Sequence, residues 1–319
     1  MTSLLVCSGG GHLKQLWSLR PRLDLDDEVL WVTFDTGLSR SLLADEDVVF
    51  APYASPRDVI NSAKGALLAE KLMRSRAISR VVSTGASLAV SFFPSARVRR
   101  IPCHYIESAT RSEGPSLAGR IVARIPGVHI YTQYPAWADH RWKYVGALFD
   151  GYRPGPSITD PPASPRKIVV TLGTTESYDF RRLVDKLEPI LPRDAEVLWQ
   201  TGSTNMTGSS VPFRETVPAE EMTAAIAEAD LVIAHCGTGS AITAMDAGKC
   251  AVLVPRMAAH NEHIDDHQSM TAAELDRRGL VVRAFVEDLN NDVFLRAMRR
   301  SVEVVPNPPP FPLVESKPR

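Results

Sequence analysis

Short apolar runs alternate along the whole chain with longer segments in which apolar and polar residues are mixed at helical spacing. In the first half, the apolar runs predict strands at residues 4–7, 29–34, 48–51, 81–84, 103–106 and 129–131. The segments between them predict helices after His12 and at residues 59–74 and 117–124. Strands that alternate with helices are typical of βαβ units and of a parallel sheet.

The second half repeats the alternation after a stretch of different composition. Apolar runs predict strands at residues 167–172, 197–200, 231–235, 251–254 and 281–282, and the segments between them predict helices at residues 180–191, 219–229, 240–247 and 263–278. The joining stretch, residues 151–166, is dense in proline, glycine and serine, which excludes a helix or a central strand and predicts a linker.

This pattern predicts two α/β domains, each a Rossmann-like doubly wound sheet. The first spans residues 1–150, the linker residues 151–166 and the second residues 167–305, followed by a proline-rich tail at 306–319 that is expected to be irregular or loosely attached. Two such domains that face each other across a cleft place ligands between them, at the carboxyl ends of the strands.

Composition places the chain among cytoplasmic globular proteins. Its net charge of −1 gives no reason to expect a nucleic-acid partner. The four cysteines form no CxxC pair, which favours reduced core thiols over a disulfide framework. The first residues lack the pattern of a signal peptide, and no apolar stretch approaches the roughly 20 residues of a membrane span. We therefore expect a soluble or peripheral protein.

The first glycine-rich loop ends in a histidine. Residues 8–12 read SGGGH directly after the first strand and before a helix, so Gly10 and Gly11 allow a sharp turn with N–H groups near a bound group. The spacing fits neither the dinucleotide fingerprint nor the P-loop. His12 stands at the loop exit, where it is a candidate general base; the alternative is a histidine that only packs against the turn.

A second candidate lies after the strand at 103–106. Glu107 stands at the carboxyl end of that strand, where a polar side chain suits a ligand-binding wall. It is a candidate for orienting an acceptor hydroxyl or sharing in proton transfer, and a satisfied surface carboxylate is the alternative. Ser116 is a fair N-cap for the helix that follows.

Two loops of the second half suit a phosphate group. Gly173, Thr174 and Thr175 follow one strand and offer N–H and hydroxyl donors. The second loop, HCGTGS, comprises His235, Cys236, Gly237, Thr238, Gly239 and Ser240 and opens a helix. A helix N-terminus presents free N–H groups and a partial positive charge, which suits a diphosphate. The alternative for either loop is an ordinary strand-to-helix connection.

Residues 260–268 are dense in histidine and acidic residues, which raises the question of a metal. The HxHxDH pattern needs a histidine at position 261, where Asn261 stands, and the HExxH pattern needs a glutamate at 264, where Ile264 stands. Recognition of hydroxyl groups by Glu262, Asp266 and Gln268 fits better than a metal site.

Taken together, these segments resemble glycosyltransferase family 28. The first half resembles the PssD-type subunit of bacterial polysaccharide transferases in SGGGHLKQL, STGAS, YIES, PSLAGR and TQYPAW, and the second half resembles the PssE-type subunit in VTLGTT, HCGTGS and EHIDDHQ. The order is kept over nearly the whole chain, so the resemblance is to both subunits fused. It extends more distantly to the MurG transferases.

The resemblance implies a GT-B fold in which the N-terminal domain serves the acceptor and the C-terminal domain binds a UDP-sugar. Gly173 and Thr174 would meet the diphosphate, the turn from Gly237 to Ser240 would meet it from the other side, and Gln268 would contact sugar hydroxyls beside Glu262 and Asp266. His12 would face the reaction centre. Relatives carry a ribose-binding glutamate where Thr243 stands here, and Asp246 lies one helical turn onward as a substitute.

The predicted activity is an inverting transfer from a UDP-sugar, which is a substrate, so neither a cofactor nor a metal is expected. His12 is the expected base, with Glu107 as its aide or rival. The expected acceptor is a polyprenyl-linked saccharide in polysaccharide biosynthesis, with peripheral contact to the inner face of the plasma membrane left open. Alternatives are a natural-product transferase with a soluble acceptor, a UDP-sugar epimerase or hydrolase, and a partner-dependent UDP-sugar-binding subunit. The donor sugar and the oligomeric state stay undecided.

Overall fold

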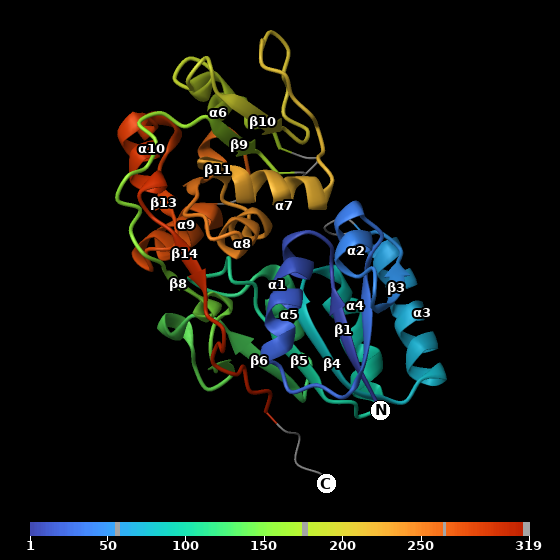
Figure 1. The fold of residues 1–319 in the computed structure, drawn as a ribbon. Coiled ribbons are helices and arrows are strands. Elements are labelled where there is room, and N and C mark those ends of the chain that lie inside the picture. The colour runs from blue at the N-terminus through green and yellow to red at the C-terminus, as the bar shows by residue number, and fades with distance from the viewer. Residues whose placement is uncertain (55–57, 174–177, 264–265, 315–319) are drawn as a thin grey trace. The chain divides into compact units, whose positions relative to one another are not determined.

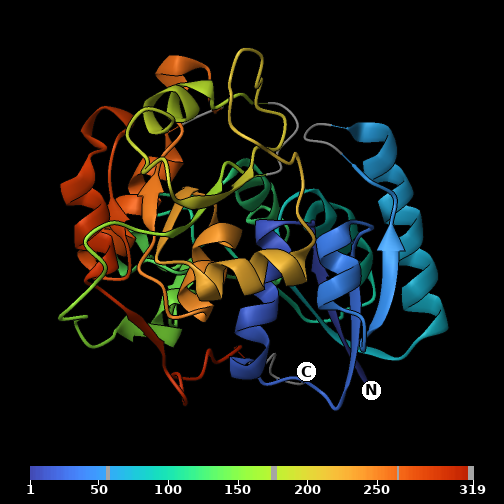
Figure 2. The same cartoon turned by 45° about the horizontal axis from the view of Figure 1, so that its top comes forward.

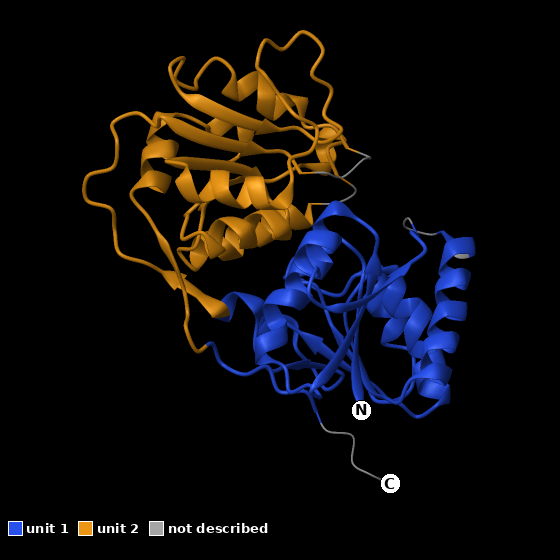
Figure 3. Cartoon of the chain, turned by 45° about the vertical axis from the view of Figure 1, so that its right-hand side comes forward, with its two compact units in different colours: residues 1–150, 308–319 blue, residues 151–307 orange. Residues whose placement is uncertain are grey.

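The computed structural model describes residues 1–54, 58–173, 178–263 and 266–314 (Figure 1). Its internal contacts divide the chain into two compact units (Figure 3): unit 1 comprises residues 1–150 together with the chain from Pro308 onward, and unit 2 comprises residues 151–307. Each unit is built on its own parallel sheet with helices packed against it. The predicted class, two Rossmann-like α/β units, is confirmed.

Unit 1 contains a seven-stranded sheet in which every neighbouring pair is parallel, in the order β3-β2-β1-β4-β5-β6-β7. The strands are β1 (Thr2–Cys7), β2 (Glu28–Phe34), β3 (Asp47–Ala51), β4 (Ile78–Gly85), β5 (Cys103–Ile106), β6 (Val128–Thr132) and β7 (Trp142–Tyr144). The helices are α1 (Gly11–Leu19), α2 (Gly37–Leu42), α3 (Val59–Ser75), α4 (Ser87–Val98) and α5 (Leu117–Val122). The order reverses between β1 and β4.

The core of unit 1 follows from the pleat of its strands. Leu4 and Val6 of β1 join a buried cluster to which α3, α4 and α5 contribute Leu72, Phe92 and Val122. Successive side chains of a strand point to opposite faces. One face of the sheet therefore packs on these three helices, and the other is left for α1 and the C-terminal segment.

The part of the proline-rich tail that the structure describes in unit 1, residues 308–314, contains no helix or strand and packs on this unit. Phe311 is fully buried and packs against Tyr131, with ring centroids 5.8 Å apart. Arg22 donates from Nε to the carbonyl oxygen of Pro309 (2.8 Å), and the N–H of Phe311 donates back to the carbonyl oxygen of Arg22 (2.8 Å). Proline residues have no N–H to donate, so the Arg22 side chain and the N–H of Phe311 supply these hydrogen bonds.

Unit 2 has a five-stranded parallel sheet in the order β10-β9-β11-β12-β13. Its strands are β9 (Lys167–Thr171), β10 (Glu196–Gln200), β11 (Leu231–His235), β12 (Val252–Val254) and β13 (Val282–Arg283). Its helices are α6 (Arg181–Leu187), α7 (Ala219–Glu228), α8 (Thr238–Asp246), α9 (His267–Arg277) and α10 (Asn291–Met298). Figures 1 and 2 show α7 and α8 side by side against this sheet.

A small antiparallel ribbon closes unit 2. It joins β8 (Tyr152–Pro154) to β14 (Val302–Val304), with Pro154 opposite Val302. Strand β8 lies in the stretch predicted as a linker. Proline is tolerated there because β8 is an edge strand whose missing N–H breaks no central ladder.

The pattern of apolar and polar residues predicts the strands of both sheets but not several other elements. The predicted strands all occur, whereas α2, α4, α10, β7 and the ribbon were not predicted. Helix α4 is the instructive case, since its sequence SLAVSFFPSARV contains Pro94, which disfavours the interior of a helix. Its helical state follows from burial between the sheet and α3, which outweighs local propensity.

Phe311→Ala is expected to lower the free energy of unfolding by about 3–5 kcal/mol, because a fully buried aromatic ring leaves a cavity when it is truncated. Guanidinium denaturation followed by tryptophan fluorescence measures the loss. Val314→Ala is the matched control, because its side chain is 44% exposed and belongs to the same segment. Equal effects of the two substitutions would contradict the packing of the tail.

Candidate active site

Each sheet has one point at which neighbouring strands send their connections in opposite directions. In unit 1 it lies between β1 and β4, and in unit 2 between β9 and β11. At such a reversal the loops diverge and leave the carboxyl ends of the strands open, which is where doubly wound folds bind ligands. His12 follows β1, Gly173 follows β9 and His235 ends β11, so the predicted residues lie at these two points.

His12 lies in the first turn of α1 and is tied to the end of β4. Its Nδ1 is 2.9 Å from the carbonyl oxygen of Thr84, and the hydroxyl of Thr84 donates to the carbonyl oxygen of His12 (2.8 Å). A carbonyl oxygen only accepts, so Nδ1 carries the proton and the Nε2 of the neutral ring keeps its lone pair. This is the tautomer that a general base requires.

Burial lowers the pKa of His12 below 6.5. The Thr84 carbonyl acts in the opposite direction, and the charge of Arg111 adds to the lowering. The side chain remains half-buried rather than enclosed. His12 is therefore a neutral imidazole near neutral pH, with Nε2 free to accept a proton.

The turn after β4 is strained beside this histidine. Ala86 has φ 63° and ψ −159°, a conformation that favours glycine. Strained backbone of this kind costs of order 1–3 kcal/mol and is concentrated at functional sites. The strained turn is therefore a further indication of a functional site at this end of unit 1.

Glu107 holds a loop together. Its carboxylate is 1% exposed; Oε1 accepts the N–H of Ser108 (3.0 Å), and Oε2 accepts the N–H and the hydroxyl of Ser116 (2.9 and 3.1 Å). Burial raises its pKa, while these donors act in the opposite direction. The bonds join the start of the loop to the N-cap of α5, so the geometry favours a structural role, and proton transfer by Glu107 stays a prediction.

Buried side chains that were not singled out from the sequence fix the same loop. Gln15 of α1 accepts the N–H of Ala109 at its Oε1 (2.8 Å), and Gln133 donates to the carbonyl oxygen of Glu107 (2.8 Å). Both glutamines are 1% exposed. The available signal was a glutamine on the apolar face of α1, between Leu13 and Leu16, because a buried amide needs partners.

In unit 2 the ring of His235 is enclosed by two glycines. A Cβ on Gly173 would lie 2.6 Å from its Cε1, and a Cβ on Gly237 would lie 2.2 Å from its Nε2. Gly237 has an ordinary φ of −85°, so closeness to the ring, rather than backbone conformation, requires glycine there. The two turns predicted to bind a phosphate therefore pack on a single imidazole.

The His235 ring has an unpaired nitrogen. Within the described part of the chain, its buried Nδ1 has no hydrogen-bond partner. Burial, followed by the charge of Arg256, lowers the pKa of His235 to about 3 against the opposing effect of a hydrogen bond between the ring and the Thr171 main chain, so the ring is neutral. A buried polar atom without a partner costs about 1–3 kcal/mol. A bound acceptor such as a phosphate oxygen would remove this cost if Nδ1 carries the proton.

Helix α8 begins at the same place. Gly237 is its N-cap, no side chain caps it, and Thr238 opens the first turn. Its first N–H groups have no partner within the helix, and the helix dipole adds a partial positive charge there. Gly239 and Ser240 belong to this turn, as predicted. Thr174 and Thr175, the other predicted donors, lie outside the described residues.

The two residues that are candidates for the ribose contact form different hydrogen bonds within the protein. The hydroxyl of Thr243 donates to the carbonyl oxygen of Gly239 (2.9 Å), so toward a ligand it acts as an acceptor. Asp246 is exposed at the end of α8 and accepts the hydroxyl of Tyr152 (2.7 Å). Either assignment stays a prediction.

Glu262, Asp266 and Gln268 each form hydrogen bonds with other groups of the protein. Glu262 is 4% exposed and forms a two-point ion pair with Arg182 (2.9 and 3.1 Å). Gln268 accepts the N–H of Arg256 (3.0 Å), and Asp266 accepts the N–H of Ala258 (2.8 Å). The amide nitrogen of Gln268 is a donor of the right kind for a sugar hydroxyl; the contacts of all three with a sugar stay predictions.

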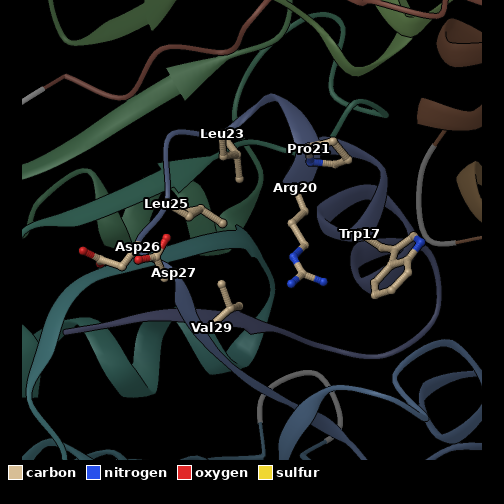
Figure 4. A pocket seen from close by; sticks show the side chains of 8 residues that line it. All are labelled: Trp17, Arg20, Pro21, Leu23, Leu25, Asp26, Asp27 and Val29. Carbon is tan, nitrogen blue, oxygen red and sulfur yellow. The ribbon is translucent and has the colours of Figure 1, made fainter.

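A surface hollow of about 420 Å³ lies elsewhere in unit 1 (Figure 4). It is bordered by Trp17, Arg20, Asp26 and Val29, from the end of α1 and the start of β2. Asp26 accepts the hydroxyl of Ser3 (2.7 Å). The hollow thus lies at the amino ends of the strands, whereas the predicted residues lie at the carboxyl ends.

Comparison with known proteins agrees with this arrangement. Residues 167–296 match the family described as Glycosyltransferase family 28 C-terminal domain. The chain is 25% identical over 296 residues to the UDP-N-acetylglucosamine–N-acetylmuramyl-(pentapeptide) pyrophosphoryl-undecaprenol N-acetylglucosamine transferase of Synechococcus sp. (strain RCC307), covering 88% of this chain and 81% of that protein. The predicted resemblance to family 28 is confirmed.

Solved structures support the fold. Acinetobacter baumannii MurG matches with a TM-score of 0.57 at 18% identity, covering 92% of this chain and 88% of that one. The UDP-N-acetylglucosamine 2-epimerase from Rickettsia bellii matches with a TM-score of 0.53 at 9% identity, covering 93% and 86%. The GT-B fold is confirmed, and because transferases and an epimerase share it, the fold alone does not choose between those activities.

Gly237→Ala is expected to destabilise the protein by about 1–3 kcal/mol, because the added methyl group overlaps the His235 ring. In a His235→Ala background the same change should cost less than about 0.5 kcal/mol, since the obstructing ring is gone. Denaturant unfolding of the four proteins of this cycle gives the coupling. Additive costs would mean that the glycine is required for another reason.

Proposed function

We propose, from the match of residues 167–296 to the C-terminal domain of glycosyltransferase family 28, that this chain moves a sugar from a UDP-sugar to a hydroxyl group of an acceptor. The observation that carries the proposal is the anion site of unit 2. There, the uncapped start of α8 meets the buried, unpartnered nitrogen of His235.

The donor diphosphate suits this site chemically. Its oxygens accept the N–H groups of the first turn of α8, and the helix dipole favours their negative charge. His235 contributes shape and a neutral nitrogen rather than charge, since its pKa is lowered to about 3. In the proposed step these donors, rather than a resident cofactor or metal, stabilise the departing UDP.

His12 is the proposed general base. The acceptor oxygen attacks the anomeric carbon and gives its proton to Nε2 of His12. The bond from the anomeric carbon to the diphosphate oxygen breaks, its electron pair leaves with UDP, and a single displacement inverts the anomeric centre. The Thr84 carbonyl accepts from Nδ1 and so stabilises the imidazolium that forms.

The proposed acceptor is a saccharide linked to a polyprenyl diphosphate. The name of the Synechococcus relative specifies an acceptor on pyrophosphoryl-undecaprenol, and the similarity covers 88% of this chain. Such acceptors reside in membranes, so the enzyme must reach a lipid surface.

Helix α3 offers a surface for this contact. Ile60 and Leu67 are each 72% exposed, and Lys64 and Lys71 are exposed on the same stripe. The spacing of four and three residues places them along one face of the helix. Among the described helices, none has the length and apolar character needed to cross a membrane. We propose peripheral binding through α3 at the inner face of the plasma membrane.

Purified protein is expected to release UDP from one preferred UDP-sugar only when a lipid-linked saccharide acceptor is present. His12→Ala should lower kcat by about 10²–10⁴ with little change in UDP affinity, because the base does not hold the donor. The acid limb of the pH profile should lie below 6.5, since burial lowers the His12 pKa and protonation below that pKa removes the base.

Coupled detection of UDP, with product analysis by mass spectrometry, provides the measurement. Glu107→Gln distinguishes the two candidate bases. His12 is expected to give the acid limb of the pH profile, so that limb should stay where it is when a Glu107 that only positions the loop is replaced by its amide. Wild-type turnover in His12→Ala would exclude His12 as the base. UDP release or epimerised donor without any acceptor would favour a hydrolase or an epimerase.

The double substitution Ile60→Glu and Leu67→Glu is expected to reduce binding to vesicles that contain anionic lipid at least several-fold, because it removes apolar anchoring and introduces repulsion. Co-sedimentation measures binding. Ile158→Glu, at a side chain that is 44% exposed in unit 2, is the control. Undiminished vesicle binding of the double variant would exclude α3 as the membrane contact.

A further inference from the structure

We propose that Arg256 is a positioning residue that fixes the donor turns of unit 2 without touching the donor. It follows β12 and its side chain is 3% exposed. Its strongest bonds go to main-chain carbonyl oxygens, from Nη2 to Leu172 (2.6 Å) and from Nη1 to Tyr178 (2.8 Å). This inference rests on the proposed function of the site.

One of these carbonyls belongs to Leu172, which immediately precedes Gly173, and the other belongs to Tyr178, which lies before α6. A guanidinium that binds both residues holds their carbonyls at a fixed separation, because its donors project from a rigid plane in defined directions. A lysine ammonium at the same place has no such fork.

Arg256 also reaches the other polar loop of the site. Its main-chain N–H donates to Gln268 (3.0 Å), and its Nη1 lies 3.4 Å from the carbonyl oxygen of Glu262. Its guanidinium carbon stands 5.1 Å from the centre of the Phe180 ring. One buried side chain therefore connects the turn after β9, the start of α6 and the loop that leads into α9.

Burial of the Arg256 guanidinium costs solvation free energy that an apolar side chain at this position would not cost. Desolvation lowers the pKa of Arg256, and the charges of Glu262 and Asp179 only oppose this effect. An apolar side chain of similar size would often stabilise a core as well as a buried charge does. The side chain is better explained by what it holds, which is the main chain at Leu172 and at Tyr178.

The held turn bears directly on the anion site. A Cβ on Gly173 would lie 2.6 Å from the His235 ring and a Cβ on Gly237 would lie 2.2 Å from it, so a displacement of Leu172 would press Gly173 on the ring that also packs against the start of α8. A misplacement of about 1 Å can cost a hundredfold in rate. Arg256 thereby sets donor affinity through Gly173 and His235.

Arg256→Lys provides the test, because lysine keeps the charge and loses the fork. Its UDP affinity, by titration calorimetry on the full chain, should fall about 10- to 100-fold, and the donor KM should rise while the acceptor KM changes less than about twofold. Hydrogen exchange should rise in peptides that cover residues 166–182 and stay unchanged in peptides that cover β11.

Arg181→Lys is the matched control. Arg181 also donates to main-chain carbonyls, those of Asn205 (3.2 Å) and Thr207 (2.6 Å), and it lies in the same unit. Its replacement should leave UDP affinity within about twofold, because neither carbonyl that it binds adjoins Gly173 in the chain.

The outcomes separate the inference from the proposed function. Wild-type UDP affinity in Arg256→Lys, an equal loss in Arg181→Lys, or faster exchange throughout unit 2 would each overturn the positioning role, the last by making Arg256 a general core residue. A wild-type protein that binds UDP neither in calorimetry nor in exchange protection would instead overturn the proposed function, and this inference with it.

Discussion

The reversal of strand order in each sheet determines where this molecule leaves backbone groups open to a ligand. Parallel strands deliver their carboxyl ends to one edge, and at the reversal the two connections leave in opposite directions. The first turn of α1 and the first turn of α8 both occupy such positions. His12 and His235 differ in what surrounds them: one is half-buried with a free lone pair, and the other is enclosed by glycines.

Around these two points, buried polar side chains bind loops rather than ligands. Glu107 and Gln15 satisfy N–H groups of one loop, and Arg256 satisfies carbonyls of another. A loop that carries function cannot be fixed by an apolar core alone, because its own backbone donors and acceptors must be paired. Buried polar side chains thus hold these irregular segments in one conformation.

The sheets could be predicted because their signal is local. An apolar run such as residues 231–235 shows its strand character without reference to anything distant, and so does the glycine turn after it. Glu262 could be recognised as a candidate and not as the partner of Arg182, since that pairing joins residues 80 positions apart. Arg256 gave no local signal, because its role depends on three loops meeting after folding. The sequence did not predict helix α4 for the same reason, since its burial between the sheet and α3 outweighs its local helix propensity.

The return of the chain to unit 1 has a consequence for synthesis. Unit 2 is an insertion, entered after Asp150 and left before Pro308. The segment that buries Phe311 against Tyr131 therefore leaves the ribosome only after the whole of unit 2. Until then the sheet of unit 1 has one face incompletely covered, with Arg22 lacking the carbonyl oxygen of Pro309. Unit 1 is completed only after unit 2 has been translated, so a chaperone that shields this face would act on the nascent chain throughout the translation of unit 2.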